Sequence, residues 1–145
     1  MKPHPYLRAY MAGIVVPTLM LILILTVYAY NRFYFEVSSQ FVIPLPSAPL
    51  DRAIAFPMAV VPNLWGAWNM LYLALRSRLK LSIGAHGAIL PLLLMPLGYA
   101  LARSLEVLPP IQWELALPMA PVGVTVYYLA WKYLVGFLNQ EVGIA

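Results

Sequence analysis

Four long apolar stretches, separated by short polar or proline-rich connections, make up most of the chain. Each approaches the roughly 20 residues that a helix needs to cross about 30 Å of hydrocarbon. They cover residues 11–30, 53–75, 81–102 and 115–138. The pattern predicts an all-α integral membrane protein, in which a single transmembrane domain of residues 1–145 forms a four-helix transmembrane bundle. The first stretch exceeds the apolar core of a signal peptide, so we expect it to be a helix of the bundle.

The composition strengthens this prediction, because the chain has too few charges to coat a surface in water. Of its 145 residues, 63% are hydrophobic and 10% are charged, against roughly 45–50% and about 25% in a soluble domain. A lipid environment removes the difficulty, since side chains that face acyl chains should be apolar. The chain has no cysteine, which excludes disulfides, thiolate nucleophiles and sites in which cysteine binds zinc or an iron–sulfur cluster.

The distribution of Lys and Arg sets the expected orientation, because cytoplasmic connections carry an excess of these residues. One side of a four-span chain would carry Lys2, Arg8, Arg76, Arg78, Lys80 and Lys132, and the other Arg32, Arg52 and Arg103. We therefore expect a multi-pass protein of the plasma or inner membrane, with both termini in the cytoplasm and connections 31–52 and 103–114 outside. Arg76, Arg78 and Lys80 are expected to contact anionic lipid headgroups. The net charge of +4 needs no nucleic-acid partner.

The helices are similar in pairs. Residues 13–19 (GIVVPTL) are similar to residues 87–93 (GAILPLL), and Pro-Met-Ala recurs at 57–59 and 118–120. The first and third helices run outward and the other two inward, so a duplication would give two parallel helix-hairpin repeats about an axis along the membrane normal. Chance is the alternative, because apolar helices share Leu, Val, Ala and Pro.

Strongly polar residues are rare within the stretches, and three of them are expected at one depth. At a rise of about 1.5 Å per residue, Asn69 lies roughly 9 Å from the inner end of its helix. His86 and Lys132 lie at similar depth on the third and fourth helices, with Tyr72 and Tyr133 just below them. Polar groups buried in hydrocarbon cost several kcal/mol unless they are paired. A shared layer would allow them to pair.

Two interpretations of this layer are open. As a functional site, His86 would relay protons or sense pH, with Asn69 as its orienting hydrogen bond. Lys132 would then bind an anionic headgroup or substrate. As a structural feature, Asn69 and His86 would hold helices together, and Lys132 would extend its amine to the headgroups.

The middle of the second helix is the least lipid-like part of any stretch, because Asn63, Trp65 and Trp68 all lie there. Trp65, Asn69 and Tyr72 follow one another at steps of four and three residues and therefore share a face of the helix. This face is expected to lie against the bundle interior or against another protein.

The chain carries no recognisable catalytic, cofactor or metal motif. Four of its five acids are expected on the outer side, namely Glu36, Asp51, Glu106 and Glu114. His86 is expected near the inner side, so no catalytic grouping with these acids can form. We expect a non-enzymatic membrane protein without cofactor or metal, either an accessory or interaction subunit of a larger complex or a homo-oligomer. The alternative is a small transporter or channel whose pathway forms by oligomerisation. Frequent prolines favour that alternative, whereas the lack of a carboxylate inside the stretches disfavours the usual coupled carriers.

Overall fold

A computed structural model describes residues 4–34, 50–104 and 113–144. These residues form helices and the short links beside them, and this part of the chain contains no strand. The predicted all-α fold is therefore confirmed. In chain order the elements are α1 Pro5–Tyr34, α2 Leu50–Leu79, α3 Ile83–Ser104, α4 Trp113–Leu129, the π-helix η1 Ala130–Val135 and α5 Gly136–Glu141.

The helices extend beyond the apolar stretches of the sequence. Residues 31–34 and 50–52, predicted to belong to the first outer connection, are part of α1 and α2. Residues 103–104 and 113–114 likewise belong to α3 and α4 rather than to the second connection. The predicted bounds were too short because the backbone of a helix continues to pair internally where apolar residues give way to polar and aromatic ones.

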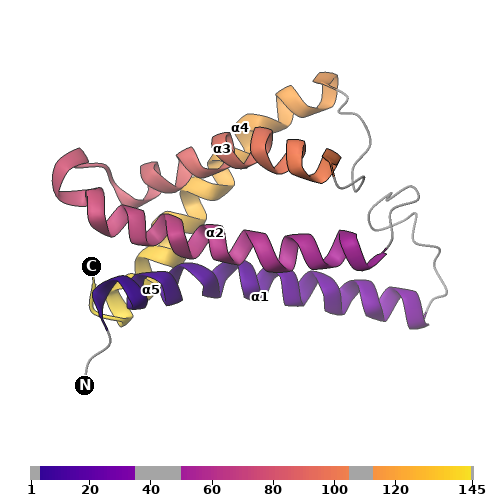
Figure 1. Cartoon of the computed structure of the whole chain (residues 1–145), viewed down its shortest axis with the longest axis horizontal. Helices are drawn as coiled ribbons and strands as arrows, with labels where there is room; N and C mark the ends of the chain where they lie inside the picture. Colours follow the sequence, from indigo (N-terminus) through magenta and orange to yellow (C-terminus); the bar gives the residue numbers. More distant parts are fainter. Residues whose placement is uncertain (1–3, 35–49, 105–112, 145) are drawn as a thin grey trace.

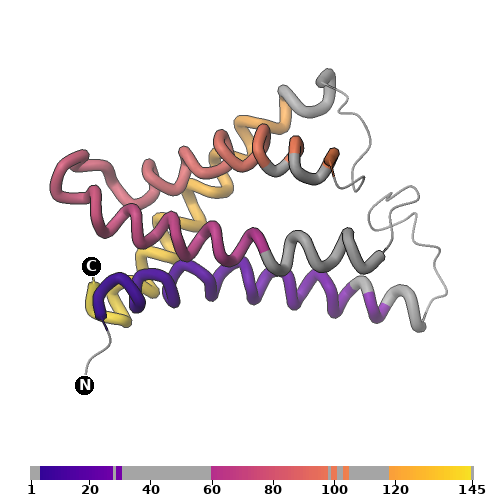
Figure 2. Tube along the Cα trace, viewed as in Figure 1, coloured from indigo at the N-terminus to yellow at the C-terminus, as the bar shows by residue number. Residues whose placement is uncertain are grey.

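The helices form two hairpins that meet at one end of the molecule (Figure 1). α1 and α2 lie side by side along most of their length, and α3 packs against α4. From α4 the chain continues through η1 into α5, which contacts α1. Figure 2 shows the two ends of the chain close together, at the end of the molecule where α2 turns into α3. We call this end, which carries Pro5, the link Lys80–Ser82 and Glu141, the link end.

The sequence specifies the turn between α2 and α3. Lys80 adopts a left-handed conformation with φ 48°, which reverses the chain after α2. The Ser82 hydroxyl accepts the Ala85 N–H at 3.2 Å, and this hydrogen bond caps the start of α3. The short link keeps α2 and α3 adjacent at the link end.

The core lies where the hairpins meet. It consists of Val16 of α1, Trp65 of α2, Leu90 of α3, and Trp131 and Val135 of η1. Large apolar side chains elsewhere on the helices are exposed, and Leu19, Leu23 and Leu97 are each more than 60% exposed. Water would penalise such surfaces strongly.

One segment of the described residues, Pro5–Val27, is long and apolar enough to cross a membrane. The apolar part of α3, Ile83–Leu97, is shorter than that criterion requires. Four membrane spans therefore stay a prediction.

In the two hairpins, the first helices, α1 and α3, bury residues at equivalent positions. α1 buries Ala12, Gly13, Val16 and Pro17. The residues 74 positions later in α3 are buried as well, namely His86, Gly87, Leu90 and Pro91. α2 and α4 do not follow the register of their shared Pro-Met-Ala. Trp65 and Asn69 are buried, and 61 positions later Val126 is exposed and Ala130 half-buried. Superposition of the two hairpins stays a prediction.

Candidate functional site

Asn69 is the centre of a hydrogen-bond network that joins three helices at the link end. Its side chain is fully buried. Its Nδ2 donates to the Ala9 carbonyl of α1 and to Oδ1 of Asn139 in α5, both at 2.8 Å. Asn139 donates from its own Nδ2 to Oδ1 of Asn69 at 3.1 Å. The Asn69 amide therefore has partners for both of its polar atoms, as buried polar groups require.

Sequence reasoning missed Asn139, because the fourth apolar stretch was expected to end at residue 138. In the structure the helix continues to Glu141, and Asn139 is buried. A usable signal was the four-residue spacing of Trp131, Val135 and Asn139, all of which are buried. The wider turn of the π-helix η1 takes more residues per turn than an α-helix, so steps of four keep these side chains on one face.

His86 is also buried, but it belongs to a different interface. Its Nε2 lies 3.1 Å from the Trp68 carbonyl, and Trp68 Nε1 donates to the His86 carbonyl at 3.0 Å. The imidazole also stacks on the Trp68 ring, with centroids 4.8 Å apart. These contacts fasten α3 to α2. Asn69 consequently does not orient His86, because consecutive side chains of a helix point about 100° apart and Trp68 takes the face toward α3.

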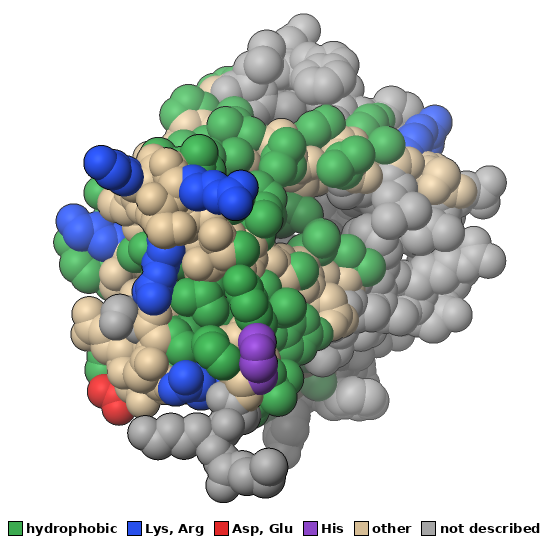
Figure 3. All heavy atoms as spheres, turned by 60° about the vertical axis from the view of Figure 1, so that its left-hand side comes forward, with side chains coloured by type: hydrophobic (Ala, Val, Ile, Leu, Met, Phe, Trp, Pro, Cys, Tyr) green, Lys and Arg blue, Asp and Glu red, His purple; other side chains and the backbone are tan. Residues whose placement is uncertain are grey.

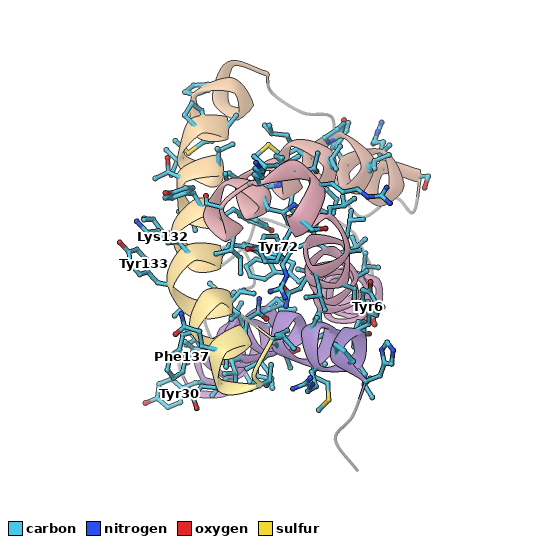
Figure 4. All side chains as sticks on the ribbon, turned by 90° about the vertical axis from the view of Figure 1, so that its left-hand side faces the viewer. Tyr6, Tyr30, Tyr72, Lys132, Tyr133 and Phe137 are labelled. Atoms are coloured by element: carbon cyan, nitrogen blue, oxygen red, sulfur yellow. The ribbon has the colours of Figure 1, made fainter. Side chains whose placement is uncertain are left out.

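Aromatic rings continue from His86 into the core. The Tyr72 ring lies 5.3 Å from His86 between centroids, and Figure 4 shows Tyr72 pointing into the middle of the bundle. Trp131 lies 6.0 Å from His86 and 5.5 Å from Trp65. The buried indole N–H groups of Trp65 and Trp131 meet no hydrogen-bond acceptor among the described residues. Apolar packing rather than hydrogen bonding therefore holds these two rings.

Two glycines make room for the tryptophans. A Cβ at Gly87 would lie 2.0 Å from Cγ of Trp131, so only glycine lets the indole pack against α3 here. A Cβ at Gly13 would lie 2.6 Å from the Trp65 carbonyl oxygen and 2.9 Å from Gly66 Cα, so α1 and α2 approach backbone to backbone.

The structure does not bring Lys132 or Tyr133 to Asn69 or His86. Both side chains are exposed and point away from the bundle in Figure 4. The Lys132 amine lies 5.1 Å from the centroid of the Tyr133 ring and 5.7 Å from that of Tyr128. The predicted polar layer therefore divides in two. Asn69 and His86 are buried, whereas Lys132 and Tyr133 of η1 lie on the surface. The buried partner of Asn69 is Asn139 of α5 instead.

Asn63 lies on the exposed side of the hairpin of α1 and α2. The hydroxyl of Tyr10 donates to its Oδ1. This hydrogen bond ties α1 to α2 one turn and a half from Asn69 along α2. Asn63 is separate from the buried network, and Trp65 and Trp68 lie between them in sequence.

Two arginines hold the chain end at the link end. Gly143, with φ 68°, donates to the Gln140 carbonyl at 2.9 Å, and Ile144 donates to the Asn139 carbonyl at 2.9 Å. This pair of bonds is the Schellman ending of a helix. Arg8 donates to the Val142 carbonyl at 2.6 Å, and Arg76 to the Ile144 carbonyl at 2.5 Å. Positive side chains also suit the negative end of a helix dipole.

Arg76 therefore differs from the other two cations predicted to meet headgroups. Its guanidinium donates to a protein carbonyl. All three side chains are exposed, with Arg78 near the end of α2 and Lys80 on the link. Figure 3 shows Lys and Arg side chains gathered on this end of the molecule, with few acidic ones among the side chains that are drawn.

The site offers little space for a small molecule. A shallow groove at the link end is lined by Tyr72, Leu75, Arg76, Leu79, Leu81 and His86, and it is too tight to admit a water molecule. Within the described ranges, no three His, Asp or Glu side chains come together as metal ligands would.

No family model, curated protein or solved structure matches this chain. Its function must therefore be inferred from its own residues.

Proposed function

We propose that the chain is a non-enzymatic, four-span membrane protein that acts as an accessory or interaction subunit. The observation that carries the proposal is α1, which is apolar on every side. Its buried face presents Ala12 and Val16, and its opposite face presents Met11 and Ile22, which are about half exposed. Only 22% of its apolar segment is buried. A helix that is hydrophobic all round belongs in a core or in a membrane, and most of this one lies outside the core.

The polar residues support a structural role rather than a reaction. Both polar atoms of the Asn69 amide bond to protein, and the His86 ring is enclosed by Trp68, Tyr72 and Trp131. Interhelical hydrogen bonds of this kind contribute about 1 kcal/mol in membranes. The link end is thus a rigid joint that leaves the apolar outer faces of the helices available to lipid or to partner proteins.

Membrane insertion and orientation can be tested with single cysteines, since the chain has no native thiol. Ser77 near the link end and Ser104 at the opposite end of α3 are both exposed. In intact cells, an impermeant maleimide should label Ser104→Cys and spare Ser77→Cys; in opened cells it should label both. Equal labelling in intact cells, or recovery of the protein in the soluble fraction, would contradict the proposal.

The subunit role is tested by purification at native expression level in a mild detergent. We expect one other membrane protein at fixed stoichiometry. Variants that place a charge on the exposed face of α1, such as Ile22→Glu, should release it, whereas Asn69→Leu should not unless the fold is lost. A chain that purifies alone, as a monomer, argues against an accessory role.

Transport by an oligomer is the second candidate, and the π-helix η1 is the observation that favours it. π-helical segments occur frequently at functional sites. This candidate predicts a homo-oligomer that carries a solute across reconstituted vesicles. A stoichiometric partner without transport would favour the accessory role instead.

A further inference from the structure

The outer surface of η1 carries a cation that no carboxylate of the described residues neutralises. Among the described residues, Lys132 forms no ion pair, and its amine lies over the rings of Tyr128 and Tyr133 at 5.7 and 5.1 Å. Such cation–π contacts orient an ammonium group without cancelling its charge. Lys132 is exposed, so its amine is open to an anion from outside the protein.

The depth of this cation is fixed by α3. A Cβ at Gly84 would lie 2.9 Å from Cε2 of Tyr128 and 3.2 Å from Cβ of Lys132, so both residues pack beside the first turn of α3. That turn follows directly on the link Lys80–Ser82, which carries another exposed cation. In a protein that crosses the membrane with its helices, the start of a span lies near the headgroups rather than in the middle of the bilayer.

An apolar stripe adjoins the cation on the same helix. Val126, Leu129, Tyr133 and Phe137 are all exposed, between 45 and 59%. Their spacing of three, four and four residues places them on one face. Figure 4 shows Lys132, Tyr133 and Phe137 pointing to the same side, away from the bundle. A surface with one cation, two tyrosine hydroxyls and an apolar stripe matches an amphiphile with an anionic head.

We propose that Lys132, Tyr128 and Tyr133 bind the phosphate of an anionic phospholipid in the cytoplasmic leaflet, with an acyl chain along the part of the stripe formed by Leu129 and Val126. The inference rests on the proposed membrane location and goes beyond it, because it assigns a specific lipid site. Lys132 supplies the charge, the tyrosine hydroxyls donate hydrogen bonds, and the nearby positive link raises the local concentration of anionic lipid. A zwitterionic lipid lacks the net charge that this arrangement favours.

The test is titration of the detergent-purified protein with phosphatidylglycerol or phosphatidylcholine of equal chain length, followed by native mass spectrometry. We expect one phosphatidylglycerol to bind preferentially. Lys132→Gln should weaken that binding about fivefold, the contribution of a single basic side chain near anionic lipid. Lys132→Arg should retain it. Arg78→Gln removes an equal charge from an exposed position on α2 near its end and should change the affinity less than twofold.

The inference is overturned if Lys132→Gln binds phosphatidylglycerol as the wild type does, if Arg78→Gln loses as much, or if phosphatidylcholine binds equally well. Lys132 is exposed, so these variants should fold, and their circular dichroism must match the wild type. Membrane insertion is scored separately by alkaline carbonate extraction. Protein that is extracted as a soluble species refutes the membrane location itself, whereas inserted protein without lipid preference refutes only the site at Lys132.

Discussion

The two helix hairpins use matching glycines in different ways. In the first, Gly13 lets α1 meet the backbone of α2 at Trp65 and Gly66. In the second, Gly87 makes room for the indole of Trp131. Both glycines lie on buried faces of corresponding helices, 74 residues apart. Similar positions thus produce a close backbone contact in one hairpin and a side-chain wedge in the other.

The difference shows that the packing of Trp131 against Gly87 tolerates less movement than the contact between α1 and α2. A backbone contact between long antiparallel helices is spread over their length, so a small shift is shared by many neighbours. Trp131 has 0% exposure and contacts Trp65 and His86 as well as Gly87. A shift there disturbs both hairpins at once, because interiors are densely packed.

The largest effect is expected at this wedge. Gly87→Ala should lower the free energy of unfolding by about 3 kcal/mol, near the upper end for overpacking a core. Gly13→Ala should cost less, about 1–2 kcal/mol, because its overlap is smaller. Both values can be measured by titrating bicelle-embedded protein with a denaturing detergent and following circular dichroism.

Gly136→Ala is the matched control for the wedge. A Cβ there would lie 3.4 Å from the Trp131 carbonyl oxygen and 3.7 Å from Ile83, which is ordinary contact. This variant should stay within about 0.5 kcal/mol of the wild type. If Gly13→Ala proves as damaging as Gly87→Ala, the distinction between the hairpins disappears.

The next effect concerns the network that joins the first hairpin to α5. Asn69→Leu should cost about 2 kcal/mol, since it leaves the Asn139 amide buried without its partner. Asn139→Leu should cost less, because Asn69 keeps its bond to the Ala9 carbonyl. The double variant should be more stable than the sum of the single losses predicts. Strict additivity would show that the two amides do not interact.

A smaller loss is expected at His86. His86→Leu removes the contact of Nε2 with the Trp68 carbonyl, but the bond from Trp68 Nε1 survives because it ends on the backbone oxygen of residue 86. The expected cost is about 1 kcal/mol, with partner binding retained per folded molecule. Normal folding with partner binding abolished would make His86 a functional residue and refute the packing interpretation.

The smallest effect is expected where Arg8 binds the Val142 carbonyl at the end of α5. Arg8→Gln should cost about 0.5 kcal/mol, a typical value for a cation at a helix end, and should speed hydrogen exchange at the amides of Gly143 and Ile144. Arg78→Gln, which removes a charge without touching these carbonyls, is the control. Unchanged exchange in Arg8→Gln would show that the Schellman turn holds without Arg8.

The sequence was enough to predict the all-α fold, the positions of four long helices and the short link between α2 and α3. Apolar length and the rarity of charge carry that information. The face of each helix was harder to predict. Asn69 and His86 are both buried, yet they bond to different helices because Trp68 rather than Asn69 faces α3.

Asn139, the partner of Asn69, was missed for a different reason. The apolar pattern ends before Asn139, so only its four-residue spacing from Val135 and Trp131 links it to the buried side of the helix. Lys132 and Tyr133 were assigned to the layer by their expected depth alone, and depth does not separate an inward from an outward side chain. Contacts between distant parts of the chain decide that, and one sequence does not reveal them.

The clamp between Arg8 and Val142 also constrains biosynthesis. These residues are 134 positions apart, and a ribosome delivers them in order, first helix first. The Arg8 guanidinium therefore lacks the Val142 carbonyl until residue 142 has been synthesised, long after α1. The joint at the link end can close only late in folding. A shortened chain that stops before α5 should therefore leave the link end of α1 and α2 uncovered, where quality-control proteases can recognise it.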